Sequence, residues 1–161
     1  MATLRNGHPY IIAEVAQAHD GSLGNAIALL DACADAGASA IKFQCHDGDD
    51  NNEFPIGRPN TYNFPQDASR RLYWDRTGFS AAGWQGLRKF AWSRSVDFGI
   101  TPFSRYAIDE FCRLEVDFFK VARGTWDLLP HIPAGRSVIA TTPHKRKHPP
   151  EDVHLIGLDE N

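Results

Sequence analysis

The sequence predicts an α/β protein built on a parallel sheet with helices packed outside it. Short apolar runs of strand length alternate along the chain with segments whose apolar residues recur at helical spacing. Several of the runs end in a charged or polar side chain, as strands do where they approach a functional site. No Gly-x-Gly-x-x-Gly follows the first run and the chain has no Walker loop, which removes the main support for a nucleotide-binding open sheet.

The first strand and helix are expected near the N-terminus. The run YIIAEV at 10–15 is apolar and ends in a carboxylate followed by valine, and residues 25–36 carry apolar side chains at helical spacing. Gly37 follows the last helical residue as a C-terminal cap, and AIKFQ at 40–44 forms a second short strand. These elements make one complete βα unit that leads into the next strand.

The second helix follows a long polar connection. Residues 45–69 are rich in Asp, Asn and Pro, and a connection of this length is either a functional loop or a mobile one; we expect it over the site. Ser80 is a good N-cap for a helix that places Trp84 and Leu87 on one face. Trp92 in the same helix is also expected to pack against the sheet. A third strand is predicted at 96–100.

The alternation continues and then breaks down. Ser104 is expected to cap a helix through Leu114, and FFKVA at 118–122 is a strand with a lysine near its end. SVIAT at 137–141 is a fifth apolar run, and VHLIG at 153–157 is a possible sixth. The segment HKRKHPPED between them contains two prolines and cannot supply a normal helix. Residues 143–161 are therefore predicted to form a divergent C-terminal tail.

These elements predict a single domain over 1–161 with the fold of an incomplete TIM-type (β/α) barrel of about five to six parallel strands. A complete eight-stranded barrel takes about 250 residues, and this chain has 161. A sheet left open after about six strands has unpaired edge groups that invite pairing with another chain. We therefore expect a homo-oligomer or a partner chain.

The composition argues against several classes of partner. With 17 Lys and Arg against 20 Asp and Glu, the net charge of -3 gives no broad positive field that would hold nucleic acid. No apolar run approaches the ~20 residues that span a bilayer, and the N-terminus lacks the profile of a signal peptide. We therefore expect no membrane association and a cytoplasmic location. The cysteines are widely spaced and suggest neither a disulfide framework nor a zinc site.

Charged and polar side chains gather at the predicted strand ends. They are Glu14, Lys42, Gln44, Thr101 and Lys120. Because the carboxyl ends of parallel strands line the active site in such folds, a carboxylate and two lysines would converge there and suit an anionic substrate. The glutamate would be able to accept a proton. Alternatively, Glu14 and Lys42 form a structural ion pair inside the barrel.

A family resemblance rests on these same residues. The segments IIAEVAQAHDGSL, AGASAIKFQ, DFGITPFS and FFKVARG resemble, in order and spacing, the N-terminal barrel of the sialic acid synthases (N-acetylneuraminate synthases) over about residues 10–142. The resemblance implies a (β/α)8 barrel that condenses phosphoenolpyruvate with an N-acyl amino sugar of the N-acetylmannosamine type to give a nonulosonic acid. It also implies a divalent metal, manganese or magnesium.

The resemblance assigns roles to individual positions. Glu14 matches the catalytic glutamate of the first strand, which faces the sugar aldehyde. Lys42 and Lys120 match lysines that hold phosphoenolpyruvate, while Gln44 and Thr101 match residues that line the substrate pocket. In this reaction the enol carbon attacks the aldehyde and water adds at the neighbouring carbon, so charge must be neutralised and a proton moved. Lysines and a glutamate suit both tasks.

The chain departs from the family pattern at several places. Ala18 stands where the family has Asn before the histidine of the first loop, although His19 remains as a candidate substrate ligand. In the family motif Lys-Ile-x-Ser-Gly-Glu, the serine and glutamate are replaced here by Arg123 and Thr125; Arg123 is expected to bind phosphate. The metal-binding histidines and sugar-binding arginine of the family have no counterpart, and Thr141, Thr142 and Pro143 stand where the family has Ser-Thr-Gly.

Several other histidines and tryptophans lie where a ligand residue could stand. His144 and His148 have the spacing of a helical metal pair, but a basic, proline-flanked loop is the favoured interpretation. His19 and His46 fall in strand-end loops, where an ordinary structural role is favoured over metal ligation. Trp126, just after the fourth strand, is a candidate for stacking on a sugar ring.

The sequence therefore supports three hypotheses. The first is a carbon–carbon bond-forming transferase of the sialic acid synthase type, active alone, as an oligomer or with a partner. The second is a catalytically inactive remnant or a binding module on the same scaffold. The third is another phosphoenolpyruvate-dependent or aldolase-like barrel, because the sugar-binding half of the family is not represented in the sequence.

Overall fold

The structure is a computed structural model and describes residues 4–5, 8–46, 67 and 70–141. Its centre is a five-stranded sheet in which every neighbouring pair is parallel and the strands follow one another in chain order. The strands are β3 (Ile12–Ala16), β4 (Ala40–Cys45), β5 (Asp97–Pro102), β6 (Phe118–Val121) and β7 (Val138–Ala140). All five predicted strands are confirmed. The possible sixth strand and the tail at 143–161 lie outside the described residues.

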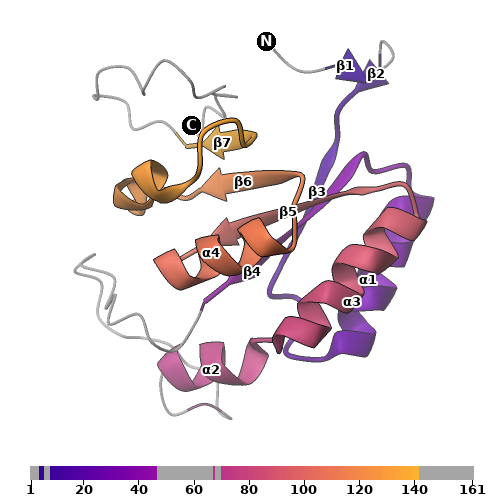
Figure 1. The fold of residues 1–161 in the computed structure, drawn as a ribbon. Coiled ribbons are helices and arrows are strands. Elements are labelled where there is room, and N and C mark those ends of the chain that lie inside the picture. The colour runs from indigo at the N-terminus through magenta and orange to yellow at the C-terminus, as the bar shows by residue number, and fades with distance from the viewer. Residues whose placement is uncertain (1–3, 6–7, 47–66, 68–69, 142–161) are drawn as a thin grey trace.

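Helices cover one face of this sheet (Figure 1). The helical elements are α1 (Leu23–Asp35), α2 (Arg70–Thr77), α3 (Ala81–Ser93), α4 (Arg105–Arg113) and the 3-10 helix η1 (Trp126–His131). Each of α1, α3 and α4 begins after a serine whose side chain accepts a backbone N–H, and the predicted caps Ser80 and Ser104 are among them. A short antiparallel pair, β1 (Leu4–Arg5) and β2 (His8–Pro9), precedes the sheet.

The end of α1 confirms the predicted glycine cap. Gly37 has a φ of +85°, a conformation that glycine adopts without a side-chain clash. The Gly37 N–H donates to the Ala34 carbonyl and the Ala38 N–H to the Cys33 carbonyl, both at 3.0 Å. These bonds satisfy carbonyls at the helix end and turn the chain toward β4.

The core lies between the sheet and the helices. Alternate residues of each strand point to this side, so Phe43, Phe98 and Phe119 are fully buried against α1, α3 and α4. From α3, Trp84 and Leu87 are buried as the helical spacing predicted. The prediction for Trp92 was wrong: its exposed fraction is 77%, because it lies on the solvent side of α3.

The helix α2 was not predicted, and charged contacts hold it against the loop that follows β3. The Arg76 guanidinium donates to the Asp20 carboxylate at 2.9 Å and to the Asp67 carboxylate at 2.9 Å. Gln17 Nε2 donates to Thr77 Oγ1 at 3.1 Å. At Gly21 an added Cβ would lie 2.5 Å from the Arg76 carbonyl oxygen, so the loop and α2 meet at backbone distance.

Candidate functional site

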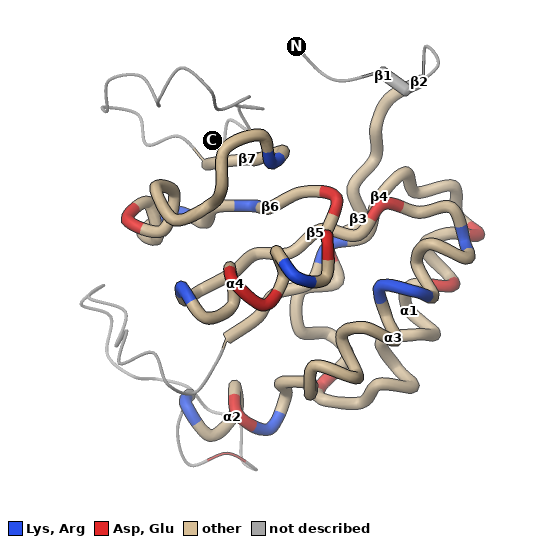
Figure 2. Tube along the Cα trace, in the orientation of Figure 1, with Lys and Arg blue, Asp and Glu red and all other residues tan. Residues whose placement is uncertain are grey.

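The face of the sheet that points away from the helices carries two layers of side chains. The first layer is apolar and consists of Ala40, Phe118 and Ile139, packed with Tyr10 and Ile12. One step further toward the carboxyl ends of the strands, the same face carries Glu14, Lys42, Thr101 and Lys120, since side chains two residues apart share a face. We call these four residues the lysine layer. Figure 2 shows, in blue, a basic position on β6.

Direct contacts join three members of the lysine layer. Glu14 and Lys42 are register partners on β3 and β4, and their side chains form an ion pair. The Lys42 ammonium also donates to Thr101 Oγ1 on β5 at 2.8 Å. Lys42 is 5% exposed, whereas the Glu14 side chain is 45% exposed. The carboxylate is therefore the accessible end of the pair, and the hydroxyl of Thr101 fixes the ammonium from the other side.

Burial lowers the pKa of Lys42 from its ordinary value. The hydrogen bond to Glu14 and the charge of that carboxylate act in the opposite direction, while the positive charge of Lys120 lowers the pKa further. Because the two ammonium groups repel each other, a bound anion between them would remove an unfavourable interaction. The electrostatics of the lysine layer therefore suit an anionic ligand.

An aromatic ring forms the floor beneath this layer. Gly99 is the register partner of Lys42 on β5, and the ring of Phe118 lies across it. An added Cβ on Gly99 would lie 2.1 Å from Phe118 Cζ and 2.3 Å from Cε2. This pair is not apparent from the sequence, because the glycine is one position inside an ordinary strand pattern and its contact residue is on another strand.

The other predicted residues of the site lie outside the lysine layer, near the carboxyl ends of the strands or in the segments that follow them. Gln44 lies at the end of β4, where its Oε1 is 3.3 Å from Nε2 of His46. The His46 ring is stacked on the rings of Trp74 and Phe103, at centroid distances of 4.4 Å and 3.9 Å. Arg123 follows β6 and is exposed. Trp126 begins η1 and donates from Nε1 to the Thr141 carbonyl at 3.1 Å.

The structure separates His19 from the lysine layer. His19 is fully buried on the helix side of the sheet, with its ring 4.6 Å from that of Phe79 and 5.9 Å from that of Phe43. The register of β3 shifts between Glu14 and Ala16, and Ala16 has a φ of +51°, so the chain turns toward the helices after the glutamate. A histidine so placed packs as part of the core.

This burial makes His19 a determinant of acid stability. Desolvation lowers its pKa below the ordinary 6.5, against the smaller raising effects of Ala16 and Asp20. The unfolded chain then binds more protons than the folded one below pH 6.5, so stability falls as the pH falls from 6.5 toward the folded-state pKa. Above pH 6.5 the group has little effect.

We expect the His19→Asn variant to lose part of this pH dependence. Asparagine keeps an acceptor for the Gly21 N–H, which donates to His19 Nδ1 at 3.2 Å, but does not titrate. Urea unfolding of the parent and the variant at pH 7.5, and at a pH about one to two units lower, would measure how the unfolding free energy of each protein depends on pH. Equal losses of unfolding free energy on acidification in the two proteins would contradict this assignment.

The described residues contain no evident metal site. Within 4–5, 8–46, 67 and 70–141, no group of three His, Cys, Asp or Glu side chains is placed to hold a metal ion. The lysine layer supplies one carboxylate, and Glu14 is already paired with Lys42. The described side chains therefore do not by themselves fit a divalent metal. His144, His148 and Thr142 lie outside the described residues, as does most of the 45–69 connection.

None of the described helices has the length and apolar character that crossing a membrane requires.

The fold and the lysine layer together define the class of protein: a partial (β/α) barrel with a carboxylate and two lysines on its inner face, near the carboxyl ends of its strands. The family model of the NeuB family matches residues 29–140, and the chain belongs to this family. Over 40 residues the chain is 55% identical to the spore coat polysaccharide biosynthesis protein SpsE of Bacillus subtilis. The matched stretch covers 25% of this chain and 11% of SpsE.

Solved structures agree on the fold. An N-acetylneuraminic acid (sialic acid) synthetase from Leptospira borgpetersenii superposes with a TM-score of 0.67 at 23% identity, covering 85% of this chain and 45% of its own. A putative spore coat polysaccharide biosynthesis protein E from Chromobacterium violaceum gives 0.67 at 22%, covering 84% and 41%. SpsE of Bacillus subtilis gives 0.60 at 28%, covering 83% and 36%.

These comparisons confirm the predicted resemblance and the incomplete barrel fold. The chain spans less than half the length of the solved structures it matches.

Proposed function

We propose that this chain binds phosphoenolpyruvate in the lysine layer and takes part in its condensation with an N-acyl amino sugar of the N-acetylmannosamine type. The observation that carries the proposal is the placement of Lys42 and Lys120 on one face, beside a half-exposed glutamate. Phosphoenolpyruvate carries a phosphate and a carboxylate, and two ammonium groups match these charges. Membership of the NeuB family supports the same substrate class.

Each residue of the layer has a role in this proposal. Lys42 holds one anionic group of phosphoenolpyruvate, and Thr101 fixes the direction of its ammonium through the 2.8 Å bond. Lys120 balances the remaining charge. Glu14 is the group that transfers a proton during the condensation, because its carboxylate is accessible and already paired with a lysine. Gln44 and Arg123 lie at the rim and are proposed to contact the substrates from there.

The chemistry proceeds by formation of one carbon–carbon bond. The methylene carbon of phosphoenolpyruvate attacks the sugar aldehyde, whose oxygen takes up a proton, and water adds at the neighbouring carbon. Loss of inorganic phosphate then gives the keto form of the nonulosonic acid. The lysine layer stabilises the anionic substrate and the departing phosphate through the whole sequence. The described residues do not by themselves fit a divalent metal.

The rest of the active site is proposed to come from outside the described residues. The solved relatives are more than twice the length that this chain covers. A second copy, a partner chain or further residues of this polypeptide would complete the sugar-binding part. A non-catalytic binding module is the second candidate, favoured by Arg123 and Thr125 where the family has serine and glutamate.

An assay of the purified chain distinguishes the two candidates. The chain is incubated with phosphoenolpyruvate, N-acetylmannosamine and manganese, and inorganic phosphate and nonulosonic acid are measured. Equal amounts of both products, dependent on the sugar, are expected from the synthase. Binding of phosphoenolpyruvate without product, alone and with candidate partners, would assign the chain as a binding module instead. Absence of both product and binding would overturn the proposal.

A further inference from the structure

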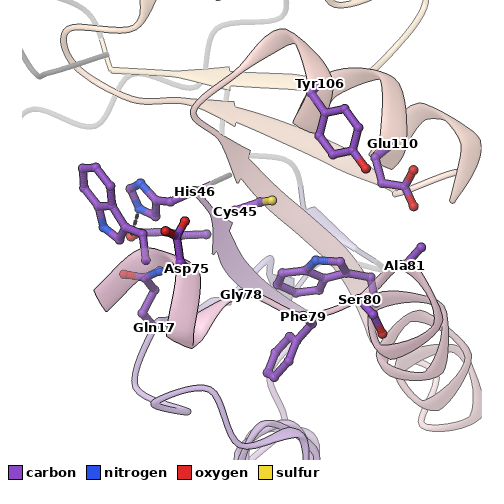
Figure 3. A pocket seen from close by; sticks show the side chains of 13 residues that line it. Gln17, Cys45, His46, Asp75, Gly78, Phe79, Ser80, Ala81, Tyr106 and Glu110 are labelled. Carbon is purple, nitrogen blue, oxygen red and sulfur yellow. Dashed lines mark hydrogen bonds between the residues drawn. The ribbon is translucent and has the colours of Figure 1, made fainter. Parts of the chain in front are cut away.

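A pocket with a volume of about 370 Å³ lies at the carboxyl end of β4, between α2, α3 and α4 (Figure 3). Its walls come from the end of β4, from α2 and the segment after it, from the start of α3 and from α4. The volume is within the range of small-molecule sites, which is about 300 to 1,000 Å³. Gln44 is the one residue that it shares with the predicted substrate site.

The charge of this pocket is opposite to that of the lysine layer. Among the described residues that line it are two carboxylates, Asp75 and Glu110, and no lysine or arginine. The Glu110 side chain is only 17% exposed, and its ion pair at 3.2 Å is with Arg113, which is 69% exposed. Arg71 lies 3.8 Å from Asp75 and is 57% exposed. Asp75 is 43% exposed, so the charges of that pair are similarly screened by solvent. Arg113 faces solvent whereas Glu110 is largely buried, so Glu110 is the carboxylate whose charge acts most strongly inside the pocket.

Aromatic rings complete this environment. Tyr106 and Glu110 are one turn apart on α4, which places a ring and a carboxylate on the same side of the helix. Tyr106 is 62% exposed, so its ring is open to a ligand. Trp74 and Phe79 line other parts of the wall. A carboxylate beside aromatic faces is the arrangement that binds ammonium ions, by charge and by cation–π attraction.

The wall formed by the start of α3 favours an oxygen atom of a ligand. The N-terminal end of α3 lies at Ser80 and Ala81, where the helix dipole is positive. Figure 3 shows these two residues on the lower wall, well separated from Asp75 and with Glu110 above them. A ligand that carries an ammonium group at one end and a hydroxyl at the other therefore matches both ends of the pocket.

We propose that this pocket binds a small hydroxylated ammonium compound. The proposal does not depend on the synthase function, because none of the lysine-layer residues lines the pocket. Phosphoenolpyruvate and other anions are disfavoured here, since they would meet Asp75 and Glu110, and no lysine or arginine is among the lining residues that the structure describes. The pocket thus favours a cationic ligand and the lysine layer an anionic one, although both sites lie near the carboxyl end of β4.

Choline and its neutral isostere test the charge requirement. In dimethylbutanol a carbon atom replaces the nitrogen of choline, so the two probes differ in charge and little in shape. Titration of each into the purified chain, followed by the NMR signals of the tryptophan indoles, gives the two affinities. We expect choline to bind with a Kd of about 1 to 10 mM and about tenfold more tightly than the alcohol. Equal affinities, or no binding of choline, would overturn the proposal.

Variants on α4 test the location. Glu110→Gln and Tyr106→Leu should each weaken choline binding about fivefold. Asp109→Asn removes a carboxylate that is exposed on the same helix and does not line the pocket, so it should change the affinity by less than about twofold. Lys42→Met should leave choline binding unchanged, which separates this site from the proposed synthase site. Equal effects of Glu110→Gln and Asp109→Asn would mean that choline binds elsewhere.

Discussion

Replacing Gly99 with alanine is expected to destabilise the protein by about 2 to 3 kcal/mol. The added Cβ would lie 2.1 Å from Phe118 Cζ, and the ring has little room to move because Phe118 is only 4% exposed. The backbone is equally constrained, since β5 is paired on both sides, with β4 and β6. Urea unfolding monitored by circular dichroism measures the loss.

Two further variants show whether the clash is the cause. Gly86→Ala introduces the same methyl group in α3, where nothing lies within 4 Å, and is expected to stabilise by up to about 1 kcal/mol through helix propensity. Phe118→Leu in the Gly99→Ala background should restore part of the stability, although Phe118→Leu alone is destabilising. A Gly99→Ala protein as stable as the parent would show that the ring does not fill this space.

The Lys42→Met variant is expected to bind phosphoenolpyruvate at least about 100-fold more weakly. The substitution removes the more deeply buried cation of the lysine layer and puts an apolar side chain of similar length in its place. Stability should change by less than about 1 kcal/mol, because Glu14 is 45% exposed and can be hydrated when its partner is gone. Isothermal titration with phosphoenolpyruvate, together with urea unfolding, measures both quantities.

A matched control is available on α3. Lys89 is exposed, and Lys89→Met removes the same charge from the molecule without touching the lysine layer. The control is expected to keep the phosphoenolpyruvate affinity of the parent. If Lys42→Met also kept that affinity, Glu14 and Lys42 would be a structural ion pair, which is the alternative that the sequence left open.

Most of the fold could be predicted because its elements are encoded locally. Strands such as AIKFQ and FFKVA alternate between residues that face the helices and residues that face the inner layer, and serine caps mark the helix starts. The helix α2 escaped prediction because its sequence, RRLYWDRT, has no apolar stripe. Arg76 stabilises its position by contacts with residues that are distant in sequence, such as Asp20.

The candidate site was predictable in part for the same reason. The strand-end rule placed Glu14, Lys42 and Thr101 together, and their contacts agree with it. The structure places His19 away from these residues, because the left-handed backbone at Ala16 redirects the chain to the helix side, and a single sequence does not reveal such a turn. The pocket beside α2 was equally hidden, since its walls come from segments that only the tertiary structure brings together.

The chain-order arrangement of the sheet has a consequence for how the molecule forms. Each strand from β4 onward pairs with the strand immediately before it, so every new βα unit meets a completed edge as soon as it has been synthesised. Growth of this kind resembles that of solenoid proteins, in which neighbouring units dock one after another. The nascent chain can therefore build its sheet from β3 to β7 on the ribosome, and each new strand pairs with the open edge of its predecessor, which would otherwise be free to pair with another chain.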